Sequence, residues 1–138
     1  MAVAPDGLPP PVCSPVPESD PVLRRLRSAE RQLLDAVRGK TDVYVLVRTG
    51  TTVDVGQWLT NGRVWACATA TDLILLAAGR APVVQKTPYH SIRESIYNPI
   101  TGEFVLAPHR ELKVNRIRVS ALEGYQMLAQ IDQGGTTC

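Results

Sequence analysis

The stretch from residue 63 to residue 76 places the strongest constraint on what this chain can fold into, because it is almost continuously apolar and has no helical period. Asn61-Gly62 precedes it, and this dipeptide favours tight turns that need positive backbone torsions. Thr71-Asp72 interrupts it with side-chain oxygens that can satisfy a local turn. We therefore predict two adjacent antiparallel strands, at 63–68 and 73–76, in the middle of a meander.

Short β-branched and aromatic runs, separated by Gly and Pro, predict the remaining strands. We expect these strands at 43–47, 52–59, 83–86, 93–97, 103–107 and 112–119. Turns are predicted at Thr49-Gly50-Thr51 and 98–102, a bulge at Gly56, and a single helical turn within 88–92. One sheet of seven or eight strands would leave a face and two edges bare, so we expect a barrel or sandwich.

An amphipathic helix is predicted on each side of these strands, which makes the chain mainly β with α, an α+β protein. Asp20 suits the N-cap of the first helix, Pro21 its first position and Gly39 its end. Ser120 and Glu123 have capping-box spacing and begin the second helix, which should cap an open end of the barrel. The predicted organisation is a Pro-rich flexible tail at 1–19, the first helix at 20–40, the folded domain at 41–132 and a second tail at 133–138.

Composition narrows the class of protein. The chain has 138 residues, of which 44% are hydrophobic and 20% charged, as expected of one globular domain. No run of about 18 apolar residues is present, and the N-terminus has no early basic residue followed by an apolar segment. We therefore expect a cytoplasmic protein without a signal peptide, and a net charge of +2 is too small to indicate a nucleic-acid partner.

No pattern of residues indicates catalysis or metal binding. Cys13, Cys67 and Cys138 are far apart, and Cys67 in its apolar strand is predicted to be a small buried hydrophobe. His90, beside Ser91, could form a small site, but a loop histidine with a local hydrogen bond is the preferred interpretation, and the same holds for His109. We predict no catalytic residue, no cofactor, no metal site and no enzymatic activity.

Two surfaces are candidates for binding a partner. The first helix carries an apolar face that can dock on the sheet or on another copy of the chain, formed by Leu23, Leu26, Leu33, Leu34 and Val37. The arginines around this face could instead hold the helix on an anionic membrane. The last strand carries a basic patch that could bind an anionic group or a partner, or be a solvated face, formed by Arg110, Lys113, Arg116 and Arg118. Trp58 and Trp65 are interpreted as core, with an exposed binding pair as the alternative.

The order of elements resembles bacterial pleckstrin-homology-like (PH-like) domains over about residues 42–131. The resemblance is carried by Thr71-Asp72 before the apolar strand, Pro88-Tyr89-His90-Ser91-Ile92 after the fifth strand, the hairpin at Gly102 and the closing helix. It implies a seven-stranded barrel capped by a helix, and a binding role in place of an enzymatic one. Phosphoinositide-binding members have a Lys and Arg cluster in the first hairpin, where this chain has Arg48 alone between Val47 and Val53, so the resemblance does not imply inositol phosphate binding.

The first functional hypothesis is a non-enzymatic binding or assembly module that presents a strand edge or a barrel-end groove to a protein partner, including another copy of itself. The second is peripheral, weak association with anionic lipid through the first helix and the last strand. The third is a carrier of a small ligand in the barrel interior.

Overall fold

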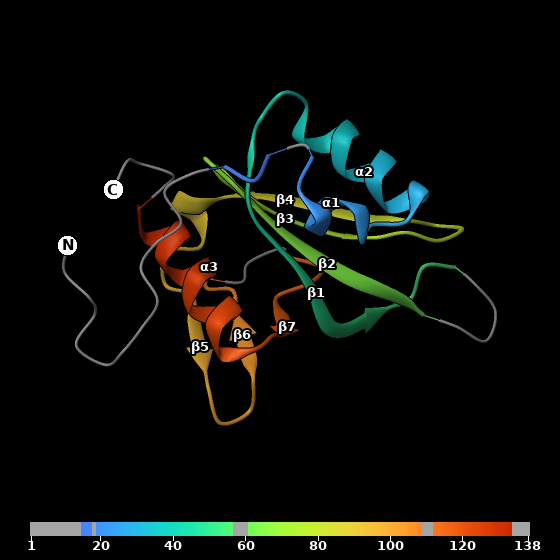
Figure 1. Cartoon of the computed structure of the whole chain (residues 1–138). Helices are drawn as coiled ribbons and strands as arrows, with labels where there is room; N and C mark the ends of the chain where they lie inside the picture. Colours follow the sequence, from blue (N-terminus) through green and yellow to red (C-terminus); the bar gives the residue numbers. More distant parts are fainter. Residues whose placement is uncertain (1–14, 18, 57–60, 109–111, 134–138) are drawn as a thin grey trace.

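The computed structural model describes residues 15–17, 19–56, 61–108 and 112–133 of the chain. Figure 1 shows three layers, with α1 and α2 on one face of a four-stranded sheet and a three-stranded sheet with α3 on the other. The elements in chain order are α1 (Pro21–Arg24), α2 (Ser28–Arg38), β1 (Val43–Val53), β2 (Gly62–Thr69), β3 (Asp72–Ala77), β4 (Val83–Pro88), the 3-10 turn η1 (Tyr89–Ser91), β5 (Ile96–Asn98), β6 (Glu103–Val105), β7 (Arg116–Arg118) and α3 (Ala121–Gln133).

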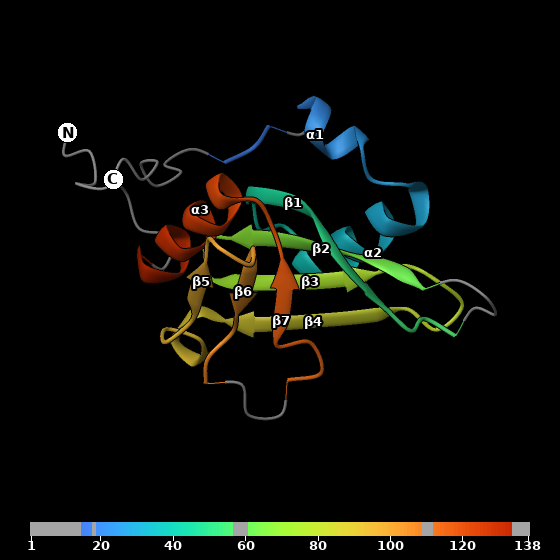
Figure 2. The same ribbon diagram turned by 90° about the horizontal axis from the view of Figure 1, so that it is seen from below.

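Both sheets are antiparallel meanders. The larger has the order β1-β2-β3-β4 and the smaller the order β5-β6-β7. In the centre of the larger sheet, Trp65 on β2 is in register with Leu76 on β3, and Ala68 with Leu73. Figure 2 shows that the strands of the small sheet cross those of the large sheet steeply. The chain is therefore an α+β protein built on two antiparallel sheets.

The apolar stretch at 63–76 is continuous because the larger sheet is covered on both faces. Alternate side chains of β2 and β3 belong to two different cores. Those on the inner face pack against the small sheet and α3, and include Val64, Ala66, Ala68, Leu73 and Leu75. Those on the outer face pack under α1 and α2, and include Trp65, Cys67, Ile74 and Leu76. The apolar run at 63–76 correctly predicted the two central strands. Few polar residues interrupt this run because each face of β2 and β3 is buried in a core.

The small sheet and α3 complete the inner core. Phe104 of β6, Ile117 of β7 and Met127 of α3 are almost fully buried in it. Gly124 allows α3 to approach β5, because a Cβ at this position would lie 2.5 Å from the Tyr97 ring. The Tyr97 hydroxyl donates to the carbonyl of Val119 at 3.0 Å, which ties β5 to the start of α3.

The two sheets meet without forming a closed barrel within the part of the chain that the structure describes. On one side, the backbone N–H of Arg118 in β7 donates to the hydroxyl of Thr51 in β1 at 2.9 Å. On the other, the Gln85 side-chain amide in β4 donates to the Val114 carbonyl at 2.7 Å and accepts from the Val114 N–H at 3.0 Å. Single side chains thus replace ladders at both seams. Of the predicted barrel or sandwich of seven or eight strands, the closed barrel is therefore wrong, and the described residues form two packed antiparallel sheets.

The predicted helix at 20–40 is two helices. Asp20 caps α1 by accepting from the Val22 N–H at 2.9 Å, and Pro21 is its first residue, as expected. The chain then turns at residues 25–27 and starts again, because Leu26 turns into the outer core and Glu30 accepts from the Arg27 N–H at 2.8 Å. Gly39 ends α2 with a φ of 59°, a torsion that glycine adopts without the steric cost that a Cβ would bring.

The strand boundaries differ from the predictions mainly around β1. The predicted turn at 49–51 lies inside β1, where a register shift between Arg48 and Thr52 takes up the extra residues. The Thr49 hydroxyl donates to the Val64 carbonyl at 2.6 Å and keeps the two strands together there. Gly62 is the first residue of β2 and is not among the glycines with positive φ. It is glycine because a Cβ would lie 2.7 Å from the Val55 side chain.

The hairpin, the helical turn and the second capping box are present where the sequence predicts them. The hairpin at 98–102 is confirmed, since the Gly102 N–H donates to the Asn98 carbonyl at 2.8 Å and Gly102 has a φ of 77°. The helical turn is present as η1, and Ser120 and Glu123 form the predicted capping box. The strand predicted at 93–97 is shorter and shifted toward the C-terminus as β5, and those predicted at 103–107 and 112–119 are shortened to β6 and β7.

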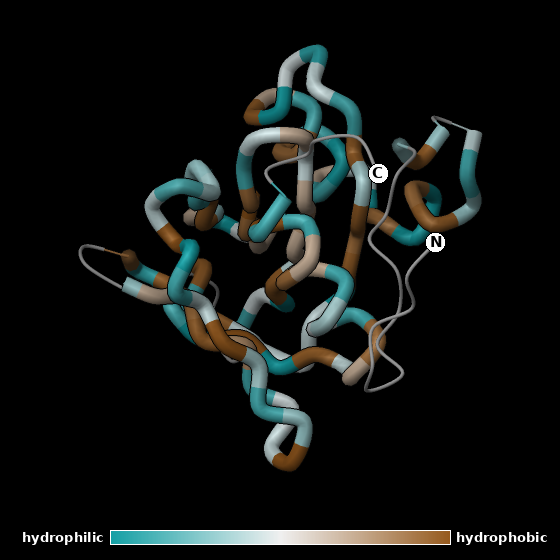
Figure 3. Tube along the Cα trace, turned by 90° about the vertical axis from the view of Figure 1, so that its left-hand side faces the viewer, coloured by the Kyte–Doolittle hydropathy of each residue, from teal (hydrophilic) through white to brown (hydrophobic). Residues whose placement is uncertain are grey.

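Hydrophobic and hydrophilic residues alternate at short intervals along the chain (Figure 3). Among the helices of the described residues, none combines the length and apolar character needed to cross a membrane. Trp58, His109, Cys13 and Cys138, together with part of the predicted strand at 52–59, lie outside the described residues.

Candidate functional site

A groove runs along the edge of the outer layer, where α1 and α2 cease to cover the larger sheet. Its volume is about 870 Å³, and we call it the arginine groove because four arginines line it. The groove is lined by Arg25, Arg27, Ala29, Glu30, Arg48, Thr52, Asn61, Gly62, Arg63, Trp65, Ala78 and Gly79.

Two of the arginines come from adjacent strands of the sheet. Arg48 of β1 is in register with Trp65 of β2, and Arg63 lies two residues before Trp65. Directly opposed residues of an antiparallel pair, and residues two apart on one strand, point to the same face. Arg48 and Arg63 therefore share the outer face with Trp65, and both are exposed where the helices no longer cover that face. The Arg63 guanidinium donates to the Thr49 carbonyl at 3.1 Å, which orients it along β1.

The other two arginines come from the turn between the helices. Arg25 follows α1 as its C-cap, and Arg27 precedes α2 as its N-cap. Leu26 between them is buried in the outer core, so the flanking arginines are directed away from it and are exposed. The break in the predicted helix thus brings two cations from a loop beside two cations from the sheet.

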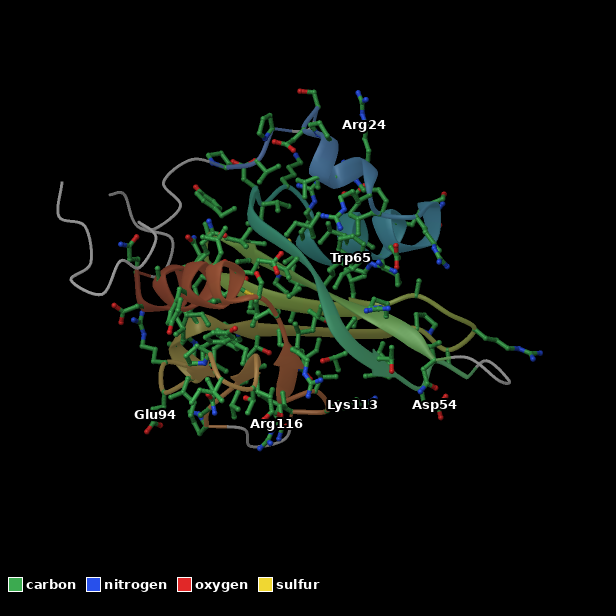
Figure 4. All side chains as sticks on the ribbon, turned by 60° about the horizontal axis from the view of Figure 1, so that its bottom comes forward. Arg24, Asp54, Trp65, Glu94, Lys113 and Arg116 are labelled. Carbon is green, nitrogen blue, oxygen red and sulfur yellow. The ribbon has the colours of Figure 1, made fainter. Side chains whose placement is uncertain are left out.

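A buried carboxylate joins the helix side of the groove to the sheet side. One oxygen of Glu30 accepts from the Arg27 N–H at 2.8 Å, and the other accepts from the Trp65 indole N–H at 2.8 Å. Glu30 is 7% exposed and Trp65 2%. Figure 4 shows Trp65 beneath α1 and α2. Its hydrogen bond to Glu30 therefore holds α2 on the sheet. The Glu30–Trp65 bond thus fixes the helix side of the groove relative to the sheet side.

The groove carries an excess of positive charge. Four guanidinium groups line it with one carboxylate, that of Glu30. Within the described residues, Arg25, Arg27, Arg48 and Arg63 make no ion pair, whereas Asp35 pairs with Arg31 and Arg38, and Glu103 with Arg116. Exposed guanidiniums without a carboxylate partner remain available to an anionic ligand.

The predicted basic patch on the last strand has less unpaired positive charge than the arginine groove. Arg116 and Arg118 lie on one side of β7, on either side of buried Ile117, and Lys113 is exposed before the strand, while Arg110 lies outside the described residues. The Arg116 guanidinium is 3.4 Å from the Glu103 carboxylate, and Glu103 is also in register with Arg118. One acidic residue therefore lies among these cations and reduces their joint potential.

The apolar face predicted for the first helix is covered by the chain's own sheet. Leu23, Leu26 and Leu34 are buried in the outer core, and Val37 packs against it in part. Leu33 is half-buried and points to a separate small pocket beside α2. The sequence allowed this apolar face to dock on the sheet or on another copy of the chain. In the structure it docks on the sheet.

His90 is exposed, and it does not line the pocket that its neighbour Ser91 lines. The His90 Nδ1 is 3.5 Å from the Ser91 hydroxyl, and Ser91 lines a pocket of about 280 Å³ with Thr87, Ile92, Pro108 and Leu112. Arg93 donates to the Asp132 carbonyl at 3.0 Å and so braces α3. Within the described residues, no three His, Cys, Asp or Glu side chains gather as a metal site would require.

Cys67 is a buried thiol of the outer core, and it gives the protein a specific alkaline sensitivity. Burial raises the pKa of Cys67 from 9.0 to about 12, against a smaller opposing effect of the Arg38 charge. The thiol has a higher pKa when folded, so its contribution to stability is complete below pH 9 and is lost as the pH rises toward 12.

We expect the unfolding free energy of the wild type to fall by about 3 kcal/mol more than that of Cys67→Ala between about pH 8 and pH 11. Urea denaturation at both pH values measures this difference, and the cavity left by the smaller side chain cancels because it is present at both. Cys13 and Cys138 are common to the two proteins and cancel as well. Parallel curves for the two proteins would contradict a buried thiol.

Few local patterns in the chain indicate the arginine groove. In the sequence, Arg48 is a lone cation of the predicted first hairpin, and Arg25 and Arg27 are among the arginines around the apolar face of one predicted continuous helix. The alternation of Arg63, Val64 and Trp65 was the one local signal, because it places Arg63 on the face of Trp65. The positions of Arg25 and Arg27 depend on a helix break that a distant contact, from Glu30 to Trp65, stabilises.

The chain matches no family model, and no curated protein or solved structure is significantly similar to it.

Proposed function

We propose that this chain is a non-enzymatic, PH-like binding module whose arginine groove receives an acidic segment of a protein partner. The observation that carries the proposal is the convergence of Arg25, Arg27, Arg48 and Arg63 on one groove without carboxylate partners among the described residues. Planar guanidiniums bind carboxylates through two parallel hydrogen bonds, so several Asp or Glu side chains in sequence would satisfy them together.

The shape of the site favours an inserted segment of chain. The helices with the turn between them line one part of the groove, β1 and β2 line another, and Ala78 and Gly79 after β3 also line it. Its volume of about 870 Å³ falls in the range of roughly 300–1,000 Å³ that ligand pockets occupy. A concave site of this size suits an inserted extended peptide better than the flat surface of a folded partner.

The fold supports the PH-like part of the proposal. A four-stranded and a three-stranded antiparallel sheet, with a C-terminal helix that packs against their shared core, is an arrangement in keeping with the resemblance in sequence. The groove, however, lies on the outer side of the larger sheet, beside two helices that precede the domain to which the resemblance extends. Binding there depends on residues of this chain that the family pattern does not supply.

Association with an anionic membrane is the second candidate. It is supported by Arg24, which is exposed on α1 and points away from the sheet in Figure 4, next to exposed Arg25 and Arg27. Three cations around one helix end could attract a negatively charged surface. Binding to phosphatidylserine vesicles that Arg24→Ala weakens, and that Arg48→Ala leaves intact, would support this candidate over the groove.

The groove is tested with a fluorescein-labelled hexaglutamate peptide and fluorescence anisotropy. We expect the double variant Arg48→Ala/Arg63→Ala to weaken binding by about 10- to 100-fold, because each arginine offers a charge-assisted pair. The matched control is Arg116→Ala/Arg118→Ala, which removes the same charge from β7, a strand that packs on the inner face of the larger sheet and does not line the groove, and it should change the affinity less than about threefold. Equal losses in the two double variants would mean that net charge, and not the groove, attracts the peptide.

A further inference from the structure

A second, apolar pocket opens beside the arginine groove. It has a volume of about 230 Å³ and lies between one side of α2 and the loop that joins β3 to β4. Ala29, Gln32 and Leu33 line it from the helix, and Ala78, Gly79 and Pro82 from the loop. Ala29, Ala78 and Gly79 also line the arginine groove, so the two cavities are neighbours that share a boundary.

The apolar pocket differs from the groove in chemistry and in size. None of the described residues that line it is charged, and Gln32 is the polar one among them. Leu33 is half-buried there and does not belong to either hydrophobic core, although its helix neighbour Leu34 is completely buried. A pocket smaller than those of ordinary small-molecule sites fits a single side chain.

The position of the pocket along α2 sets its distance from the cations. Arg27 and Leu33 are six residues apart, and a helix rises 1.5 Å per residue, which gives about 9 Å along the axis. An extended peptide rises about 3.3 Å per residue, so about three of its residues span that distance. A peptide with its acidic side chains in the arginine groove would therefore bring a side chain to the apolar pocket after a short spacer.

We infer that the partner segment of the proposed function carries one aliphatic side chain, about two to four residues from its acidic run, and that this side chain enters the pocket at Leu33. The inference rests on the proposed function, because the arginine groove supplies the charge complementarity that directs the segment to this place. The acidic run provides attraction and register, and the aliphatic residue provides the specificity that charge by itself lacks.

Two labelled peptides test the inference on the wild-type protein. Both contain four glutamates, and three residues later one has leucine and the other serine. We expect the leucine peptide to bind about fivefold to tenfold more tightly, as burial of most of one aliphatic side chain provides. Equal affinities would overturn the inference, and the proposed function would still stand if both peptides lost binding in Arg48→Ala/Arg63→Ala. Failure of both peptides to bind the wild type would overturn both proposals.

A variant of the pocket locates the effect. Leu33→Ser should reduce the preference for leucine over serine to less than about twofold and keep the dependence on Arg48 and Arg63. Leu122→Ser is the control, since Leu122 is an exposed aliphatic residue on α3, 56% exposed, and it should keep the full preference. A preference that survives Leu33→Ser in a folded variant would place the aliphatic side chain elsewhere and overturn the inference.

A lipid is the other ligand that combines an anionic and an apolar part. Phosphatidylserine vesicles are therefore added to the bound leucine peptide at equal concentration of negative charge. We expect the peptide to remain bound, because a pocket for one side chain does not accommodate an acyl chain. Displacement that depends on Leu33 would assign the pocket to lipid and overturn the inference.

Discussion

Replacing Glu30 with alanine is expected to lower the free energy of unfolding by about 3 kcal/mol, a large share of the stability of a small domain. Glu30 accepts two hydrogen bonds, one from the Arg27 N–H and one from the Trp65 indole, each at 2.8 Å. Alanine leaves the indole N–H buried without its acceptor and removes the cap of α2. Urea denaturation followed by far-UV circular dichroism measures the loss.

The largest part of this effect should come from the bond to Trp65. A buried donor without an acceptor costs about 1–3 kcal/mol, whereas a cap at a helix N-terminus contributes about 1 kcal/mol. In a Trp65→Phe background, which has no indole donor, Glu30→Ala should therefore cost only about 1 kcal/mol. The difference between the two backgrounds is the coupling energy of the pair.

Glu94→Ala is the control for removing a carboxylate. Glu94 is exposed and lies at the far side of the molecule from Trp65 in Figure 4. Its replacement should change the stability by no more than about 0.5 kcal/mol. If Glu30→Ala costs as little as Glu94→Ala, or if the cost is the same with Trp65 and with Phe at position 65, the contact does not hold the helices on the sheet.

Gly79→Ala is expected to destabilise the protein by a similar amount, about 3 kcal/mol, for a steric reason. A Cβ at this position would lie 2.2 Å from Val55 Cγ2 and 2.4 Å from Val55 Cβ. Val55 is completely buried, and Gly62 at the start of β2 approaches the same side chain. The two glycines admit Val55 to the end of the sheet, so an alanine must expel it or displace the loop after β3. Thermal or urea denaturation measures the loss.

The clash can be separated from a general intolerance of the loop. Val55→Gly removes the side chain that the new methyl group would meet and leaves the Val55 carbonyl oxygen at 3.1 Å, so Gly79→Ala should cost clearly less in that background. Gly50→Ala is the matched control, because a Cβ there would lie 3.6 Å from the Arg118 side chain, an ordinary contact. It should change the stability by no more than about 0.5 kcal/mol. Additive losses at Gly79 and Val55 would be evidence against the clash.

Several features of the fold follow from signals that act within a few residues of one another. Asp20 with Pro21, Gly39, and Ser120 with Glu123 determined helix ends, and Gly102 determined a hairpin. The apolar run at 63–76 determined the two central strands, since neither a helix period nor a solvent-facing alternation fits it. These elements depend on backbone torsions and local hydrogen bonds, which the neighbouring residues supply.

The site depends on contacts between residues that are far apart in the chain. Glu30 and Trp65 are 35 positions apart, and their hydrogen bond accompanies the break between α1 and α2. A helix pattern from 20 to 40 could not indicate that break, because helical period is retained across it while packing turns Leu26 inward. The closed barrel is wrong for a related reason. Strand patterns do not show whether two sheets are joined by a ladder of backbone hydrogen bonds or by a side chain such as Gln85.

The sequence by itself therefore determined the class of elements and the centre of the larger sheet, because hydrophobic period and capping are properties of adjacent residues. Tertiary structure decided which face of that sheet the helices cover and where their cover ends. That limit places Arg25 and Arg27 beside Arg48 and Arg63. Cations separated in the chain become one site only when packing of the apolar side chains leaves them at the same edge.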